Sequence, residues 1–214
     1  MSTRESQKAE RREMILDAAR ALILEGARGD FSMPQLAAAA GVALVTPYNL
    51  FGSKGNILLA IAQESIFEPM REIEHLPCDD LGRFISDLSS VLARVYHGDR
   101  HFYRRLIQTL TAQESAEGIK AVVKLNYERF EPLIEKLLER KMLRPILGKQ
   151  VVAQQFAHMI AAALQHRLIT RGSEERLKLE FELGLILIAA GLASAADRTV
   201  LLERAREIEK AIEQ

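Results

Sequence analysis

Residues 32–58 read SMPQLAAAAGVALVTPYNLFGSKGNIL, and this stretch decides the fold. Ser32 lies three residues before Gln35, the spacing at which a capping hydroxyl and a returning side-chain amide satisfy each other's backbone N–H groups. This spacing predicts a short helix over residues 33–40. Gly41 follows, and a residue without Cβ can adopt a positive φ there. A second short segment then reaches residue 50 or 51, so the stretch is a helix-turn-helix candidate.

The residues that follow the turn predict where the next helices start and stop. Thr46 and Pro47 make a good N-cap and first helical residue, which predicts a late start for the second short helix. Ser53 is expected to cap a longer helix that begins at Lys54. Pro69 has no N–H to donate to the carbonyl four residues earlier, so we expect it to kink or end that longer helix.

The rest of the chain has the composition of an all-α protein. Ala, Leu, Glu, Arg and Lys dominate, apolar residues recur three and four positions apart, and alternating runs of β-branched residues are absent. Pro, Gly and Asp residues separate the periodic segments. The further helices are expected at about residues 3–25, 80–97, 99–111, 115–141, 149–171, 173–195 and 199–212.

Composition bounds the class of protein. Of 214 residues, 48% are hydrophobic and 27% charged, so there is ample material for a core and no case for global disorder. The 29 basic residues balance the 29 acidic ones. Because the whole molecule has no net field toward nucleic acid or an anionic membrane, a DNA-binding function must rest on local pattern.

Several kinds of site and location are not expected. The single cysteine, Cys78, fits a reducing compartment, and neither a signal peptide nor a bilayer-spanning apolar run is present, so we expect a cytoplasmic protein with no membrane partner. No nucleophile setting or Gly-rich phosphate loop indicates an enzyme or a cofactor. His97 and His101 have i,i+4 spacing but no third ligand, so no metal site is expected.

The stretch from Arg12 to Leu58 resembles the N-terminal domain of the TetR (tetracycline repressor-like) family of bacterial transcriptional regulators. The matching features are Ile15, Ala18, Ala19, Gly26, Leu36, Ala37, the Ala40-Gly41-Val42 turn, Thr46, Tyr48, Phe51, Ser53, Lys54 and Leu58. The resemblance implies an all-α protein with a three-helix DNA-binding head at residues 1–55. It also implies a helical ligand-binding and dimerisation domain at residues 56–214.

The residue types of the helix-turn-helix suit two kinds of DNA contact. Thr46, Tyr48 and Lys54 offer a hydroxyl, a phenol and an ammonium for phosphate contacts, and the matching family positions make such contacts. Base reading is expected from Leu44, Val45, Asn49 and Gln35. Asn and Gln can pair with adenine, whereas Leu and Val can only touch thymine methyl groups or exclude bases. This apolar surface predicts few direct hydrogen bonds and a strong dependence on DNA shape.

Arg4, Lys8, Arg11 and Arg12 precede the motif. Over residues 1–58, seven basic side chains oppose six acidic ones, a net charge of about +1. The sequence therefore leaves two interpretations open for this cluster: a contact with the DNA backbone, or a solvated start of the first helix.

The C-terminal part carries the other expected contacts. The resemblance implies an effector cavity for an apolar or amphipathic small molecule, with candidate lining residues Phe67, Tyr96, Phe102, Tyr103, Leu106, Tyr127, Phe130, His158 and Met159. It also implies a two-fold dimer through a four-helix bundle, whereas purely intrachain packing is the alternative. The candidate interface residues are Ala161, Leu164, Leu185, Ile188 and Leu192.

These expectations combine into one functional hypothesis. The protein would be a homodimeric, ligand-responsive regulator, most simply a repressor, that binds a palindromic operator and is released by a small-molecule effector. The helix that starts at Lys54 would act as the lever and would bend at Pro69. The alternative is a helical ligand-binding dimer that acts through a protein partner without binding DNA.

Overall fold

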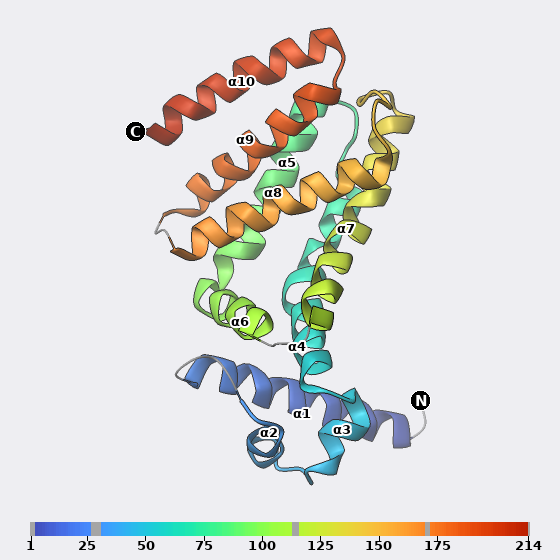
Figure 1. The fold of residues 1–214 in the computed structure, drawn as a ribbon, viewed down its shortest axis with the longest axis vertical. Helices are drawn as coiled ribbons and strands as arrows, with labels where there is room; N and C mark the ends of the chain where they lie inside the picture. Colours follow the sequence, from blue (N-terminus) through green and yellow to red (C-terminus); the bar gives the residue numbers. More distant parts are fainter. Residues whose placement is uncertain (1–2, 27–30, 113–115, 170–171, 214) are drawn as a thin grey trace. The chain divides into compact units, whose positions relative to one another are not determined.

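The computed structural model describes residues 3–26, 31–112, 116–169 and 172–213, without the side chains of residues 3, 100, 111–112, 116–126 and 164–169. Every regular element in these ranges is a helix (Figure 1), which confirms the all-α prediction. The helices form two compact units: unit 1 comprises residues 1–68 and 99–122, and unit 2 comprises residues 69–98 and 123–214. Unit 1 therefore includes one helix that lies far beyond the expected 1–55 head in sequence. The functional boundary after residue 55 stays a prediction.

Unit 1 is built around its first helix. Buried apolar residues recur at helical spacing on that helix, at Ile15, Ala19 and Ile23, and they pack against α2, α4 and α6. Arg105 on α6 adds a hydrogen bond to the carbonyl of Gly26 at the end of α1. The elements of unit 1 are α1 (Thr3–Glu25), α2 (Met33–Ala39), α3 (Val45–Phe51), α4 (Lys54–Ala62), the π-helix η1 (Gln63–Phe67) and α6 (Arg100–Ala112).

The chain changes its helical geometry before Pro69. The α-helix predicted from Lys54 ends at Ala62, earlier than expected, and widens into a π-turn in which the N–H of Glu68 donates to the carbonyl of Gln63 at 2.9 Å. Pro69 then starts the 3₁₀ helix η2 (Pro69–His75). The prediction that Pro69 interrupts the helix is confirmed. The disruption spreads upstream because a proline ring crowds the carbonyl four residues before it.

A side chain from another helix satisfies that carbonyl. The Tyr103 hydroxyl on α6 donates to the carbonyl oxygen of Ser65 at 2.8 Å. Ser65 is the residue to which an N–H at position 69 would donate in an uninterrupted α-helix. The irregular turn is therefore tied to α6 by a long-range hydrogen bond.

Unit 2 is a helical layer around α9. The elements of this unit are η2, α5 (Leu81–Gly98), the larger part of α7 (Ala116–Glu139), α8 (Lys149–Ile169), α9 (Glu174–Leu192) and α10 (Ala195–Glu213). Helix α9 packs against α5, α8 and α10, and Figure 1 shows it between α8 and α10. The core contains the buried rings of Phe84, Phe130, Phe156 and Phe181.

Two ends in unit 2 differ from the predicted ones. Helix α7 ends at Glu139, and Lys141 beyond it adopts a φ of 59°, the left-handed conformation that closes many helices. Helix α10 begins at Ala195 rather than near Thr199, because the Ser194 hydroxyl accepts a hydrogen bond from the N–H of Asp197 at 3.2 Å. Helix α10 is thus capped by a serine and starts four residues before the start predicted from the sequence.

Helices α9 and α10 are also joined by a buried charge. The Glu182 carboxylate is buried on α9, and the Arg204 guanidinium on α10 donates to it at 2.7 Å. Within the part of the chain that the structure describes, none of the helices combines the length and apolar character that a bilayer crossing needs.

Candidate nucleic-acid interface

The first helix of the motif starts at the predicted capping box. The Ser32 N–H donates to Gln35 Oε1 at 2.8 Å, and the Ser32 hydroxyl accepts from the Gln35 N–H at 3.3 Å. Met33, Leu36 and Ala37 point into the core of unit 1. Because Gln35 Oε1 is engaged in the cap, its side chain cannot make a bidentate pair with adenine without breaking that cap.

The turn between α2 and α3 has the geometry that a glycine allows. Gly41 has a φ of 63°, and an added Cβ would meet no atom within 4 Å. The N–H of Val42 donates to the carbonyl of Ala37 at 3.0 Å, closing the end of α2. The predicted positive φ at Gly41 is confirmed, and the backbone conformation alone requires glycine there.

Helix α3 starts earlier than the sequence predicted. It begins at Val45, so Thr46 lies inside the helix rather than at its N-cap, and the N–H of Thr46 donates to the carbonyl of Ala43 at 2.8 Å. Pro47 is then the third helical residue and is buried. The first residues of a helix have no intrahelical partner for their N–H groups, so proline costs no helical hydrogen bond at this position.

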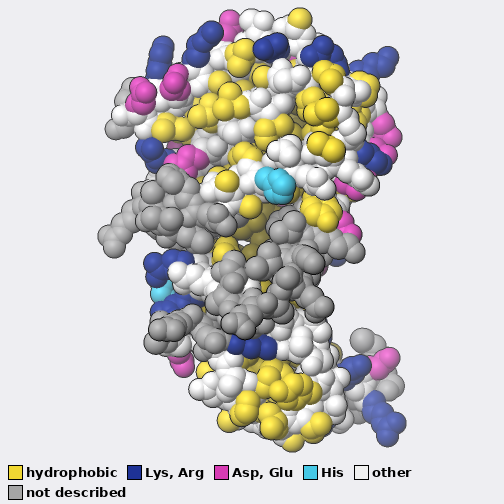
Figure 2. Space-filling view, viewed as in Figure 1, with side chains coloured by type: hydrophobic (Ala, Val, Ile, Leu, Met, Phe, Trp, Pro, Cys, Tyr) yellow, Lys and Arg dark blue, Asp and Glu magenta, His cyan; other side chains and the backbone are white. Residues whose placement is uncertain are grey.

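The exposed side of the motif is mainly apolar. Leu44, Val45 and Tyr48 expose 49%, 58% and 47% of their surfaces. Asn49 is exposed beside them, one position after Tyr48. Figure 2 shows hydrophobic side chains gathered at the end of unit 1 where Figure 1 places α2 and α3. The structure therefore brings four of the seven predicted DNA-contacting residues to the surface of one short helix and its start.

Lys54 lies at the start of α4, as predicted, with partial burial. Ser53 caps this helix by accepting a hydrogen bond from the N–H of Asn56 at 3.2 Å. The Lys54 ammonium lies 4.8 Å from the ring centroid of Phe31. This cation–π contact holds the ammonium over the ring of Phe31.

A polar groove separates α3 from the beginning of α1. It has a volume of about 350 Å³ and is lined by Arg4, Gln7, Lys8 and Arg11 of α1 and by Thr46, Asn49 and Leu50 of α3. The sequence pattern leaves the role of the basic α1 residues open, and they are not among the predicted DNA-contacting residues. Their i, i+4, i+7 spacing was the signal that a single helix face carries them.

The geometry of unit 1 matches a known family. Residues 15–61 match the family model described as bacterial regulatory proteins, tetR family. The N-terminal region of the chain is therefore similar to the DNA-binding domain of this family. This match covers α2, α3, the C-terminal half of α1 and most of α4, the elements that build the motif. No curated protein sequence matches the chain.

Solved structures share the fold of this chain. RolR in complex with resorcinol is 16% identical, with a TM-score of 0.64, and the match covers 95% of each chain. SmeT, the repressor of the Stenotrophomonas maltophilia multidrug efflux pump SmeDEF, is 21% identical, with a TM-score of 0.63 over 87% of this chain and 92% of that one. A SmeT–triclosan complex is 21% identical, with a TM-score of 0.62 over 88% of this chain and 94% of that one.

The effector candidates divide between the two units of the chain. Four of them belong to unit 1, namely Phe67, Phe102, Tyr103 and Leu106, and five belong to unit 2, namely Tyr96, Tyr127, Phe130, His158 and Met159. Most are buried or half-buried, but His158 is exposed on α8. Burial, and secondarily the carboxylate of Asp99, raises the pKa of the Tyr103 phenol. Tyr103 is thus a protonated donor in the hydrogen bond to Ser65.

The predicted dimer residues have unequal exposure. Ala161 is exposed and Ile188 is half-buried, whereas the side chain of Leu164 lies outside the described residues. Leu185 is 0% exposed and packs in the core of unit 2, while Leu187 on the same helix is 59% exposed. The periodicity placed Leu185 on the outer face, but the contacts of α9 with α5 and α10 turn it inward.

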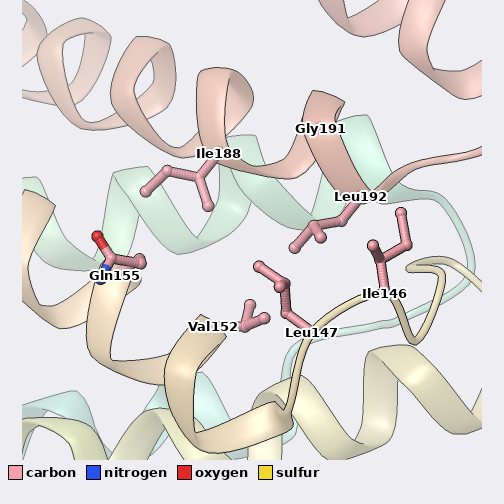
Figure 3. Close-up of a pocket in the computed structure, with 7 residues that line it drawn as sticks. All are labelled: Ile146, Leu147, Val152, Gln155, Ile188, Gly191 and Leu192. Carbon is pink, nitrogen blue, oxygen red and sulfur yellow. The ribbon is translucent and has the colours of Figure 1, made fainter.

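An apolar groove of about 280 Å³ lies between α8 and α9 (Figure 3). Ile146 and Leu147 enter it from the loop before α8, and Ile188 and Leu192 enter it from α9. Val152, Gln155 and Gly191 complete the lining. Figure 2 shows hydrophobic side chains gathered on this face of unit 2. The exposed apolar surface is therefore continuous with Leu192 and Ile188 of the predicted interface.

Proposed function

We propose that this chain is a homodimeric, ligand-responsive transcriptional repressor in the cytoplasm, which binds a palindromic operator and leaves it when a small molecule binds. The observation that carries the proposal is the outward face of α3 in a tetR-family helix-turn-helix. Leu44, Val45, Tyr48 and Asn49 are presented there by a short helix whose underside is buried. The major groove of B-DNA admits such a helix. Each protomer supplies one helix to one half-site.

Two kinds of contact divide the work at this surface. Thr46, Tyr48 and Lys54 bind phosphates, which fixes the orientation on the duplex, while Asn49 pairs with adenine. Leu44 and Val45 contact thymine methyl groups, and Gln35 acts mainly through its cap. Since one amide supplies most of the direct reading, DNA shape contributes much of the selectivity.

The effector in this proposal is an apolar or amphipathic molecule with an aromatic ring. Its proposed contacts in unit 2 are the predicted aromatic residues Tyr96, Tyr127 and Phe130, with Met159 adding thioether surface and His158 a polar group. The support is the ring-rich composition of these helices together with the shared fold of RolR with resorcinol and of SmeT with triclosan. Phe67, Phe102, Tyr103 and Leu106 of unit 1 stay predictions from the sequence.

Dimerisation in this proposal uses the outer face of α8 and α9. Ile188 and the largely buried Leu192 of the predicted interface line the groove at Ile146. Ala161 on α8 and Leu187 on α9 are exposed on the same two helices. Small and branched side chains on two helices of one protomer can pack against the same face of a second copy, which generates a four-helix bundle with two-fold symmetry. Leu164 is retained in this interface as a prediction.

Release from DNA is proposed to use α4 as a lever. Effector binding would favour a conformer in which α4 changes its orientation and the two reading helices no longer match the half-site spacing. The π-turn and the proline after α4 are where regular helical hydrogen bonding stops. If Pro69→Ala releases from its operator at the same effector concentration as the wild type, the bending point lies elsewhere.

The test of the DNA-binding function is selection of duplexes from a random pool with purified protein. An enriched palindrome whose affinity falls steeply with salt is expected. Lys54→Ala should weaken binding to all duplexes and lower the salt slope by about one unit, whereas Asn49→Ala should cost about 1–3 kcal/mol at one base pair and relax the preference there. Uniform loss in both variants would remove Asn49 from base reading.

The second candidate function is a ligand-binding dimer that acts through a protein partner. The apolar outward face of α3, with Leu44 and Val45 about half-exposed, favours this alternative because such residues also suit a protein contact. The same selection separates the two functions. A folded dimer that enriches no duplex would replace the repressor by this alternative.

A further inference from the structure

The groove between α1 and α3 carries a local charge that the composition conceals. Arg4, Lys8 and Arg11 are exposed and line one wall, and Thr46 and Asn49 line the other. Among the described residues, none forms an ion pair with Arg4, Lys8 or Arg11. Figure 2 shows Lys and Arg side chains at the end of unit 1 where Figure 1 places the start of α1. The wall therefore presents three uncompensated positive charges.

Helical geometry separates these cations from the acidic residues of α1. At about 100° per residue, Arg4, Lys8 and Arg11 fall within about 60° of one another. Glu10 lies about 120° from Arg4 on the same wheel. Its carboxylate accepts a hydrogen bond from the Ser6 hydroxyl at 3.4 Å. The net charge of about +1 over residues 1–58 therefore hides a row of three cations on one face at the start of α1.

The fourth cation of the cluster has a different role. The Arg12 guanidinium carbon lies 4.4 Å from the ring centroid of Phe51, the last residue of α3. Arg12 does not line the groove. It packs against the ring and links α1 to α3, so the three groove cations are held at a fixed position relative to the reading helix.

The dimensions of the wall suit a nucleic-acid strand. Seven residues separate Arg4 from Arg11, a rise of about 10 Å along the helix. One DNA strand carries one phosphate per nucleotide, so a row of cations of this length can face neighbouring phosphates of a single strand. Thr46 on the opposite wall supplies a hydroxyl, which is a neutral phosphate donor.

We propose that Arg4, Lys8 and Arg11 form, with Thr46, a second phosphate-binding site that holds the DNA backbone beside the bases read from α3. This inference rests on the proposed DNA-binding function and extends it. A recognition surface with mainly apolar side chains forms few charged contacts of its own. The α1 wall supplies that missing attraction, so affinity comes largely from phosphates and selectivity from Asn49 and from DNA shape.

The experiment compares a triple variant with a charge-matched control. Arg4→Gln, Lys8→Gln and Arg11→Gln are combined in one protein. Arg198→Gln, Arg206→Gln and Lys210→Gln are combined in another, since these exposed cations on α10 change the net charge equally in unit 2. Circular dichroism establishes that both variants remain helical. Dissociation constants for the selected operator and for an unrelated duplex are then measured over a series of salt concentrations.

The groove variant should lose about 0.9 units of salt slope per phosphate contact, about 2.7 units for each protomer and twice that for the dimer on its operator. At about 0.15 M salt this corresponds to roughly 100-fold weaker binding for each protomer, equal for both duplexes, because phosphate contacts carry no sequence information. The α10 control should keep the wild-type slope. Arg4→Lys with Arg11→Lys should also keep it, since a point charge suffices for this contact.

Distinct results would overturn the inference. Selective wild-type binding together with an unchanged slope in the groove variant would refute the second phosphate site alone. A loss that depends on the bases flanking the operator would show base reading by α1 in place of phosphate binding. A wild-type protein that binds no duplex would refute the proposed DNA-binding function, and this site with it.

Discussion

Replacing Tyr103 with phenylalanine would remove one hydrogen bond and keep the aromatic ring. The hydroxyl donates to the carbonyl of Ser65 at 2.8 Å, in the turn where Pro69 offers no N–H. A typical net contribution is about 1 kcal/mol, and an acceptor left without a partner costs up to about 3 kcal/mol when it is buried. Both groups are half-buried, so we expect a loss of about 1–1.5 kcal/mol in the free energy of unfolding.

The same hydrogen bond has a predicted pH dependence. Burial, and secondarily the Asp99 carboxylate, raises the pKa of Tyr103 above its ordinary value of 10.0. The folded state therefore favours the protonated phenol. Its contribution to stability is fully present below the unfolded pKa of about 10 and is lost as the pH rises through the raised folded value. The difference between wild type and Tyr103→Phe should shrink at strongly alkaline pH.

The assay is urea unfolding at pH 7, monitored by circular dichroism. The unfolding midpoints of two proteins are compared only if their m-values are equal. A double-mutant cycle with Pro69→Ala tests the physical cause. The alanine N–H can donate to Ser65, so Tyr103→Phe should cost about 0.5–1 kcal/mol less in that background. A cost below about 0.3 kcal/mol, or an equal cost in both backgrounds, would refute the role assigned to this hydrogen bond.

Further predictions concern backbone conformation, buried charge and assembly. Gly41→Ala should lower stability by about 1–2 kcal/mol, because the positive φ at this position disfavours a residue with a Cβ. Lys141→Gly should raise stability by about 0.5–1 kcal/mol, because it removes a Cβ from a residue that also has a positive φ. Thermal unfolding checks the sign of both changes. Arg204→Met should cost about 2 kcal/mol at pH 7, because it leaves the buried Glu182 carboxylate without its cation, and a loss below about 0.5 kcal/mol in urea unfolding would contradict this. Leu187→Asp should convert a dimer into a folded monomer by sedimentation, and Val200→Asp on α10 is the matched exposed control that should not.

Local chemistry fixed much of what the sequence predicted. The bounds of α1, the Ser32–Gln35 capping box, the positive φ at Gly41 and the cap at Ser53 each depend on side chains and backbone within a few residues of one another. Such interactions are present in the pattern itself. The exposure of Leu44, Val45, Tyr48 and Asn49 was predicted for the same reason, since the apolar underside of a short helix leaves one face outward.

The errors in the prediction come from interactions that compete with local preference. Thr46 and Pro47 have the residue types of a helix start, yet α3 begins at Val45 because the turn from Ala43 already closes a hydrogen bond. Helix α10 starts four residues early for a similar reason. It is capped by Ser194, which the spacing of Pro, Gly and Asp residues did not predict as a helix start. In both cases two start signals lie within a few residues, and the packing of the preceding segment selects one.

The sequence alone determined that this protein is all-α, that it carries a tetR-like helix-turn-helix, and where most of its helices lie. Only the tertiary structure decided which side chains meet across that framework. It turned Leu185 inward and left Leu187 exposed, joined Tyr103 to Ser65 across 38 positions of sequence, and set the α1 cations opposite Thr46. The helical period predicts which residues share a face of a helix. It does not predict which residues that face contacts, because burial and ion pairing depend on segments that are distant in the chain.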